Sequence, residues 1–293
     1  MPAITDEIYI LDRNIIESAR LDEQHAFFVD VIGGNLIHPS ITQDNLFAIA
    51  DIATGTGAWL RDVSQLLPTK QPTQDSPQRY YHGFDISSAQ FPEKPFQSNM
   101  EFSVHDILQP FPQEHVGRYD FVNVRFLLGA IKEADYMKAV INATSLLKPK
   151  GYLQWAELDA DLFSQNKPEE FPRFSEIVRL VFALDQNGLC SHASDAVYYA
   201  ALFSSGLTSI TKHVYSSLDN PKLDDKARVW CVNGFGALLP GGLVRSKTLA
   251  ATSSPEEVNE MTEHLLQEVK ELFARGVVPD GHFAVVVGQK GPA

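Results

Sequence analysis

The sequence predicts an α/β fold with a doubly wound parallel sheet, and three stretches of the chain support this prediction. Residues 46–60 read LFAIADIATGTGAWL, an almost unbroken apolar run that breaks at glycines and resumes with helical spacing. Residues 79–87 and 100–108 read as two further strands. Such apolar runs are typical of strands buried on both faces, and their alternation with helices indicates a parallel sheet.

The first strand leads into a loop that predicts a nucleotide-type cofactor. Glycines after a strand let the backbone approach a ligand closely, and the helix that follows offers unpaired N–H groups and its positive end. We therefore expect Asp51, Thr54, Gly55 and Gly57 to hold the cofactor. The third glycine of a dinucleotide loop is replaced by Leu60, which makes NAD or FAD, and hence a nicotinamide oxidoreductase, a weak alternative. No phosphate-binding P-loop follows either.

The second and third strands each end in an aspartate at the same edge of the predicted sheet. Asp85 closes the second strand, where nucleotide-binding sheets hold ribose hydroxyls, and Ile86 follows it. Asp106 closes the third strand, where it can accept a hydrogen bond from an adenine amino group while Ile107 packs on the ring. One aspartate at a strand end is usually a turn former. Three strands that each end in an aspartate at the same edge of the sheet are instead typical of a ligand site. We expect these four residues to bind the cofactor.

Four more strands and a helix complete the predicted sheet. The strands are expected at residues 119–127, 151–159, 207–218 and 282–289, with the helix at 135–147. The ligand crevice of a doubly wound sheet lies outside the carboxyl ends of its strands. This adds Asn123 and Arg125, near the end of the fourth strand, to the predicted cofactor site.

Several segments share a resemblance to one group of proteins. They are YILDRNIIESARLDEQH (9–25), HPSI (38–41), DIATGTGAWL (51–60), GFDIS (83–87), YDFVNVRFLLGAIK (119–132) and LLKPKGYLQWAELD (146–159). Together they resemble fungal secondary-metabolism methyltransferases, the group of the gliotoxin-pathway N-methyltransferase and, more distantly, of regulators of the LaeA type. The resemblance covers residues 5–160 closely and the remainder loosely.

The resemblance implies a class I methyltransferase that uses S-adenosylmethionine (SAM) and acts on small natural products. Its sheet would be Rossmann-like and seven-stranded, with the last strand inserted antiparallel between the fifth and the sixth. One departure is visible at Ala156, where such proteins often carry an acidic residue in the W-x-E-L-D run. That run closes the fifth strand, so the departure bears on acceptor chemistry.

The resemblance also implies that a helix at residues 14–31 closes over the cofactor as a lid. Tyr9, Arg20 and His25 would then face the site, with Tyr9 toward the substrate. We expect Arg20 to bind the methionyl carboxylate through two hydrogen bonds; the alternative is a surface ion pair with a neighbouring acid. The candidates for a general base are His25 and Glu157, and the alternative for Glu157 is a structural partner of an arginine.

The C-terminal half is expected to select the methyl acceptor. A long insertion at residues 219–280 precedes the last strand and contains a capping box that begins a helix at Ser254. Trp230 and Phe235, together with Trp155, are expected to line a hydrophobic acceptor pocket, with simple core packing as the alternative. The chain then divides into an N-terminal helical lid (1–45), a SAM-binding Rossmann-like core (46–165), and a helical acceptor-binding cap with the final strands (166–293).

Composition and motifs disfavour several classes of partner. A net charge of −13 disfavours binding to a phosphate backbone, which argues against a DNA or RNA methyltransferase. The amino-methylating D/N-P-P-[YF] tetrapeptide is also absent after the fourth strand. Cys190 and Cys231 make neither a disulfide framework nor a metal cluster. No apolar run approaches the ~18 residues of a membrane span, and the N-terminus is too acidic for a signal peptide. We expect a cytoplasmic protein with no metal, nucleic acid or membrane partner; the oligomeric state, a homodimer included, stays open.

The predicted activity is transfer of a methyl group from SAM to an oxygen or nitrogen atom of a small, fairly apolar natural product, with S-adenosylhomocysteine (SAH) as the second product. The sulfonium already activates the methyl group, so placing the acceptor in line at about 3 Å matters more than a base. One alternative is a SAM-binding regulator of the LaeA type, which a closed acceptor pocket would favour. Another is a SAM-binding protein that promotes isomerisation or pericyclic chemistry, which would release no SAH.

Overall fold

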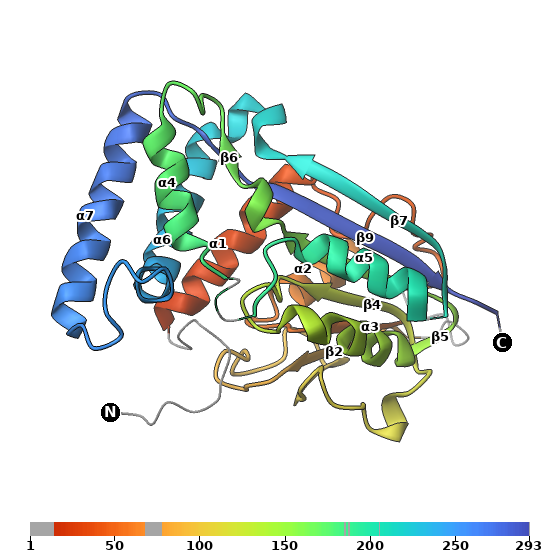
Figure 1. Cartoon of the computed structure of the whole chain (residues 1–293). Coiled ribbons are helices and arrows are strands. Elements are labelled where there is room, and N and C mark those ends of the chain that lie inside the picture. Colours follow the sequence, from red (N-terminus) through yellow and green to blue (C-terminus); the bar gives the residue numbers. More distant parts are fainter. Residues whose placement is uncertain (1–14, 68–77, 185, 187, 205, 293) are drawn as a thin grey trace.

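The computed structural model describes residues 15–67, 78–184, 186, 188–204 and 206–292, and within them it contains the predicted seven-stranded sheet (Figure 1). The strands are β1 (Ala48–Ile52), β2 (Tyr80–Asp85), β3 (Met100–Val104), β4 (Tyr119–Arg125), β5 (Leu147–Leu158), β7 (Leu207–Ser216) and β9 (His282–Lys290). Their order is β3-β2-β1-β4-β5-β9-β7. The strands β1 to β5 pair in parallel, and β9 runs antiparallel between β5 and β7. The predicted fold class is confirmed, including the antiparallel insertion of the last strand.

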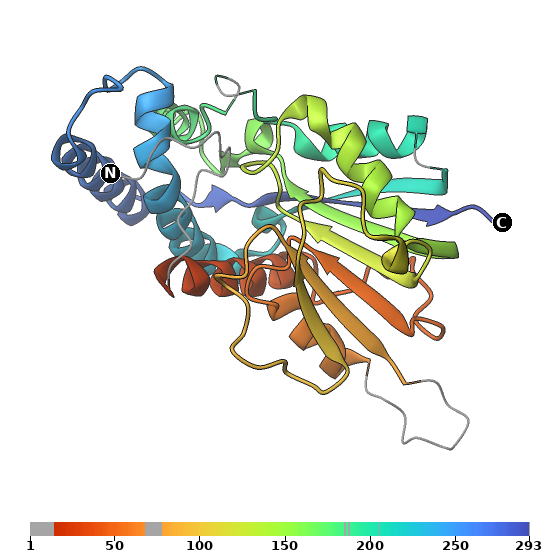
Figure 2. The same ribbon diagram turned by 90° about the horizontal axis from the view of Figure 1, so that it is seen from below.

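Helices cover both faces of the sheet (Figure 2). The helices α3 (Tyr136–Ser145) and α5 (Ala193–Ser204) lie on one face, and α1 (Ile15–Val31) and α2 (Ala58–Leu66) lie on the other. Alternate residues of a strand point to opposite faces. Accordingly Ile49 of β1 joins the core under α1 and α2, while Ala50 joins the core under α3 and α5. Burial on both faces is the reason that the strands read as apolar runs.

A second group of helices packs beside the sheet. It comprises α4 (Pro172–Val181), α6 (Asp224–Arg245) and α7 (Pro255–Ala274), and α6 also packs on α1 (Figure 1). Two stacked rings, Phe27 of α1 and Trp230 of α6, join these helices with centroids 4.9 Å apart. The short strands β6 (Ser164–Gln165) and β8 (Pro279–Asp280) pair separately. The 3₁₀ turns are η1 (Gln113–His115), η2 (Glu133–Asp135), η3 (Ala160–Leu162), η5 (Ser217–Asp219) and η6 (Pro221–Leu223).

The helix α7 begins at the predicted capping box. The Ser254 hydroxyl accepts a hydrogen bond from the Glu257 N–H at 3.2 Å, and the Glu257 carboxylate accepts one from the Ser254 N–H at 2.8 Å. Both orphan donors of the first turn are thereby satisfied. Among the described residues, no helix is long and apolar enough to cross a membrane.

Three elements differ from the expectation. The sequence does not predict α6, because Gly234, Gly236 and Pro240 interrupt its helical pattern. The strand β5 begins at Leu147 rather than at residue 151, since Leu147 pairs with Tyr119 ahead of a shift in register. Residues 173–187 read as one amphipathic helix in the sequence, whereas α4 ends at residue 181. None of these differences moves the predicted strand ends, which position the site.

Candidate active site

A cavity of about 400 Å³ lies outside the carboxyl ends of β1, β2, β3 and β4, where the sequence predicts the ligand crevice. Its walls include residues from segments 20–25, 52–58, 85–90, 105–108, 125–131, 158–184 and 230–238, and also residue 283. The end near β1 to β3 carries Asp85 and Asp106, and the end under α6 carries aromatic rings. The cavity can therefore contact both polar and apolar parts of a ligand.

Most of the predicted site residues line this cavity. They are Arg20, His25, Thr54, Gly55, Asp85, Ile86, Asp106, Ile107, Arg125, Trp230 and Phe235. In contrast, Asp51, Gly57, Asn123, Trp155 and Glu157 do not line it, and Tyr9 lies outside the described residues. The structure brings the first group together from six segments of the chain; their contact with a cofactor or acceptor stays a prediction.

The glycine loop after β1 turns in the left-handed region against Asp85. Gly55 and Gly57 have φ angles of +53° and +73°, and the Gly55 N–H donates to Asp85 Oδ2 at 2.9 Å. A Cβ on Gly55 would lie 3.3 Å from Leu21 of α1, whereas a Cβ on Gly57 would lie 2.9 Å from the Phe102 ring. Gly55 thus lets the loop pack closely on α1, and Gly57 lets it pack on β3.

Asp51 and Asn123 hold this loop from beneath. Asp51 accepts a hydrogen bond from the Thr54 hydroxyl at 2.7 Å and another from the Asn123 amide at 2.8 Å. The Gln154 amide in turn donates to Asn123 Oδ1 at 3.1 Å. Burial raises the pKa of the Asp51 carboxyl, against the charge of Arg125. Neither residue lines the cavity, and both belong to a buried hydrogen-bond network beneath the loop. The expected contact of Asp51 and Asn123 with the cofactor stays a prediction.

His25 of α1 joins β4 to α2. Arg125 Nη1 lies 2.8 Å from His25 Nδ1, and His25 Nε2 lies 3.0 Å from Asp62 Oδ2. Because a guanidinium only donates, Nδ1 must accept, so the ring proton sits on Nε2 and is donated to Asp62. Burial, and then the charge of Arg125, lower the pKa of His25 to about 4. With both nitrogens engaged and a low pKa, the ring is poorly suited to act as a general base.

Two arginines lie at the polar end of the cavity and have different partners. Arg20 donates to Glu17 at 2.7 and 2.6 Å and to Gln24 at 2.6 Å, an intrahelical pairing. Arg125 Nε is buried and has no partner within the described chain. Burial lowers the pKa of the Arg125 guanidinium. Since an unpaired buried donor is costly, Arg125 is better placed than Arg20 to receive an anionic group.

Trp155 and Glu157 face away from the cavity. They are two residues apart on β5 and so point to one face, the face covered by α3 and α5. Glu157 Oε1 accepts from Trp155 Nε1 at 2.8 Å and from the Leu127 N–H at 3.0 Å. Burial raises the pKa of Glu157 to about 8. Glu157 thus holds the loop after β4 through Leu127, and Trp155 holds Glu157. The expected roles, Trp155 in the acceptor pocket and Glu157 as a base, stay predictions that this placement disfavours.

That loop begins with a strained residue. Phe126 has a φ angle of +57°, which is rare for a bulky side chain. Its N–H donates to the Ala156 carbonyl at 3.0 Å, and the next N–H, of Leu127, binds Glu157. Such strain persists where the surroundings over-determine it, often at functional sites. The turn aims Arg125 and residues 126–131 at the cavity.

The apolar end of the cavity is built from aromatic rings. Phe163 lies 5.7 Å from both Trp230 and Phe235, and Phe283 lies 5.6 Å from Trp230, measured between ring centroids. Phe182 packs edge-on against Phe235 at 6.3 Å. The sequence indicates Trp230 and Phe235 but misses the other three rings, because they come from three separate segments with no shared periodicity.

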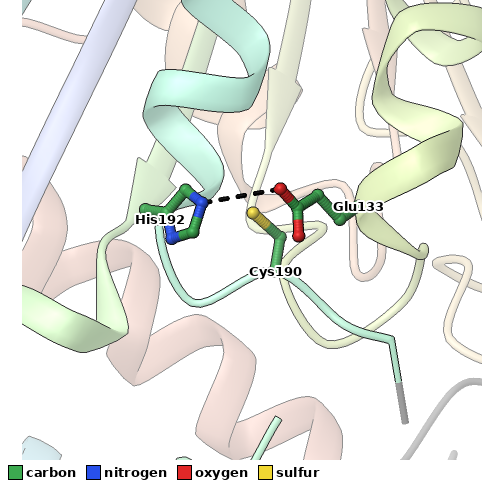
Figure 3. A group of neighbouring side chains, drawn as sticks. All are labelled: Glu133, Cys190 and His192. Carbon is green, nitrogen blue, oxygen red and sulfur yellow. Dashed lines mark ion pairs between the residues drawn. The ribbon is translucent and has the colours of Figure 1, made fainter. Parts of the chain in front are cut away.

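A second cluster of side chains lies outside the cavity. Glu133 of η2, Cys190 and His192 each bring one ligand-type atom to within 4.8 Å of the others (Figure 3). Glu133 Oε1 lies 3.5 Å from His192 Nε2. Both cysteines of the chain are free. Cysteine spacing alone does not reveal this cluster, because Glu133 is distant along the chain.

The strand order, the antiparallel β9 and the glycine loop that faces a cavity define a class I methyltransferase, the SAM-dependent group with a Rossmann-like sheet. No family profile matches the chain. Methyltransferase grgD of a Penicillium species is 33% identical over 222 residues, which cover 75% of this chain and 76% of that protein. The chain belongs to the family of fungal methyltransferases that includes grgD.

Other relatives match over shorter stretches. N-methyltransferase sirN of Leptosphaeria maculans is 32% identical over 165 residues, 56% of this chain and 54% of sirN. N-methyltransferase gliN of Aspergillus fumigatus is 27% identical over 175 residues, 59% of this chain and 58% of gliN. The chain thus aligns with a little over half the length of these two relatives.

Solved structures resemble the chain only distantly. Phosphoethanolamine N-methyltransferase 2 of Haemonchus contortus, in complex with SAM, is 12% identical with a TM-score of 0.49, covering 96% of this chain and 57% of that one. An O-methyltransferase family protein of Burkholderia thailandensis is 12% identical with a TM-score of 0.48, covering 94% and 59%. Similarity at this level says nothing about the acceptor.

Proposed function

We propose that the protein binds SAM at the polar end of the cavity and transfers its methyl group to a nitrogen atom of a small, fairly apolar natural product. The observation that supports this most is one cavity with a polar end at the strand ends and an aromatic end under α6. Nitrogen is favoured over oxygen because the relatives sirN and gliN are named N-methyltransferases.

The side chains at the strand ends suit the parts of SAM. Asp85 already accepts from the Gly55 and Ser87 N–H groups, and carboxylate oxygens have lone pairs left for ribose hydroxyls. We assign Asp106 to the adenine amino group, with Ile107 packing on the ring. Arg125, whose buried Nε has no partner among the described residues, is assigned to the methionyl carboxylate.

The chain's part in the chemistry is placement and exclusion of water. When bound, SAM supplies a methyl group already activated by its sulfonium. The rings of Phe163, Trp230 and Phe235 orient an apolar acceptor, while α1 and α6 shield the cavity from solvent. His25 is unsuited to deprotonate the acceptor, since both its nitrogens are engaged. A neutral amine needs no proton removed before it attacks, which fits this site better than a hydroxyl does.

The division of the chain follows from the same assignment. We propose that residues 1–45 act as the lid, because α1 covers the polar end of the cavity through Arg20 and His25. The core, 46–165, would hold SAM. The cap, 166–293, would select the acceptor through α6, whose Trp230 and Phe235 line the aromatic end. A cavity with Trp230 and Phe235 on its wall supports an enzyme over a regulator of the LaeA type.

Binding and turnover test the proposal in two steps. SAM and SAH should both raise the thermal unfolding temperature, because a ligand that binds only the native state stabilises it by mass action. Binding of NADH without binding of SAM would overturn the cofactor assignment.

Turnover is then measured with a panel of apolar secondary amines and matched alcohols, following SAH and methylated product together. We expect SAH with an N-methyl product. An O-methyl product would overturn the nitrogen assignment alone, and rearranged acceptor without SAH would overturn methyl transfer.

A further inference from the structure

We propose that Glu133, Cys190 and His192 form a binding site for one divalent transition-metal ion, with zinc as the favoured occupant. The three side chains lie outside the cavity, so the inference does not rest on the proposed methyl transfer. Zinc takes thiolate, imidazole and carboxylate ligands in tetrahedral sites, and water can fill the fourth position. Thiolate and imidazole select zinc over magnesium or calcium, which prefer oxygen ligands.

The three ligand atoms already stand close to coordination spacing. All lie within 4.8 Å of one another, and Glu133 Oε1 and His192 Nε2 are 3.5 Å apart. With metal–ligand bonds of about 2.0–2.3 Å, two ligands of a tetrahedral ion are separated by about 3.3–3.7 Å. Small side-chain rotations would therefore bring all three atoms onto one ion.

Burial of the three groups matches the layout of a metal site. The Cys190 side chain is buried, while the side chains of His192 and Glu133 are 47% and 59% exposed. The sulfur lies at the floor, and in Figure 3 it points between the ring and the carboxylate. An ion can enter from solvent at the rim. As the sulfur–metal bond forms, the thiol proton leaves to solvent.

An ordinary surface ion pair explains only part of this arrangement. It accounts for Glu133 and His192, which are exposed and 3.5 Å apart. It does not account for a buried thiol directed at the same gap. A metal ion accounts for all three groups.

The ion would join two walls of the cavity. Glu133 closely follows the lining loop 126–131, and Cys190 follows Leu189, which packs with the lining residue Leu184. The two segments are already linked by the Glu133 N–H, which donates to the Gly188 carbonyl at 2.9 Å. A metal would add a link between side chains. We therefore assign it a structural role, to hold the loop after β4 in place.

Cobalt titration of the chelator-treated, tag-free protein under reducing conditions tests the site. We expect one Co²⁺ per chain, with a thiolate-to-cobalt charge-transfer band that Zn²⁺ abolishes by displacement. Cys190→Ser should remove the band. Cys231→Ser is the matched control, because Cys231 is also buried and free but lies outside the cluster; it should keep the band. His192→Ala and Glu133→Gln should each weaken Zn²⁺ binding by at least about tenfold.

Thermal unfolding gives a readout that survives a poorly folded cysteine variant. His192 is exposed at the rim, so His192→Ala should fold as the wild type does without metal. At the same concentration, Zn²⁺ should raise the unfolding temperature of the wild type more than that of His192→Ala. A cobalt spectrum without a thiolate band, a band that persists in Cys190→Ser, or an equal zinc response in both proteins would overturn the site.

Discussion

Asp85 illustrates how one carboxylate serves both the loop and the predicted ligand. Its Oδ2 accepts the Gly55 N–H at 2.9 Å, and Oδ1 accepts the Ser87 N–H at 3.2 Å. Asp85→Ala should weaken SAM binding by about 1.5–3 kcal/mol, the range for hydrogen bonds to charged groups. Asp85→Asn, which keeps an acceptor oxygen, should lose less. Calorimetry with SAM measures both, and wild-type affinity in Asp85→Ala would place the cofactor elsewhere.

The two arginines of the site allow a direct comparison. Arg125 has a buried nitrogen without a partner in the described chain, whereas Arg20 is paired with Glu17 and Gln24. Arg125→Gln should therefore weaken SAM binding more than Arg20→Gln does. Adenosine, which lacks the methionyl group, should bind both variants alike. Calorimetry with SAM and adenosine checks this, and a larger loss in Arg20→Gln would restore the sequence-based assignment.

Glu157 should behave as a positioning residue. Glu157→Gln keeps an oxygen for the Leu127 and Trp155 N–H groups, so single-turnover methyl transfer should fall by less than about tenfold, short of the ~10²–10⁴ attributed to a general base. Glu157→Leu leaves two buried donors unpaired, each costing about 1–3 kcal/mol; urea unfolding should register this. A large rate loss in the glutamine variant, with a missing limb of the pH profile, would make Glu157 the base after all.

At the scale of secondary-structure elements, the helix α6 depends on a glycine contact. A Cβ on Gly242 would lie 2.2 Å from the Leu180 carbonyl oxygen of α4. Gly242→Ala should therefore destabilise the protein by about 1–3 kcal/mol. Gly236→Ala is the matched control in the same helix, because its Cβ would meet Leu266 only at 3.7 Å; it should stabilise by up to about 1 kcal/mol. Equal urea midpoints for the two variants would contradict this account.

The same helix shows where sequence reasoning stops. The parallel strands could be predicted because burial on both faces leaves apolar runs, and the strand ends then located Asp85, Asp106 and Arg125 at one edge. The helix α6 could not, since its glycines and proline oppose helix formation locally and only tertiary packing overrides them. The aromatic end of the cavity could not be predicted either, because its rings come together only through the packing of α6 and of loops that are distant along the chain.

The side of β5 that faces the cavity could have been predicted from the sequence. Trp155 and Glu157 alternate with Ala156 and Leu158 along β5, so the two pairs must face opposite sides of the sheet. Leu158 lines the cavity and Trp155 does not. In a strand that is buried on both faces, the apolar run does not indicate which residues face the ligand. The alternation of residues in a neighbouring strand could have indicated it.

At the scale of the whole molecule, buried titratable groups should shape the pH dependence of stability. Burial raises the pKa of Glu157 from 4.5 to about 8. Between these values the native state holds a proton that the unfolded chain has released, so stability falls as pH rises. Burial lowers the pKa of His25 from 6.5 to about 4 and that of His82 from 6.5 to about 3. Because the unfolded chain binds protons that these buried histidines do not, they lower stability as pH falls below about 6.5.

The interval from pH 6.5 to 8 therefore isolates Glu157 from the two histidines. The free energy of unfolding of the wild type should fall across this interval, and the fall should be smaller in Glu157→Gln. Below pH 6.5, His82→Gln should reduce the loss of stability on acidification. Urea unfolding at pH 5, 6.5 and 8 measures both effects. Identical pH profiles for the wild type and Glu157→Gln would show that Glu157 does not carry its proton in the folded protein.

The composite cavity has a consequence for how such enzymes diversify. Its polar end is formed by residues at strand ends that are also part of the sheet, so substitutions there would affect both the fold and the proposed SAM site. Its aromatic end depends largely on the face of one helix and on loops that pack over it, with Trp230 and Phe235 as its main rings. Under the proposed assignment, substitutions of the rings on α6 would alter the range of acceptors while the binding of SAM stays the same. Related proteins with different rings on α6 would then act on different metabolites by the same methyl transfer.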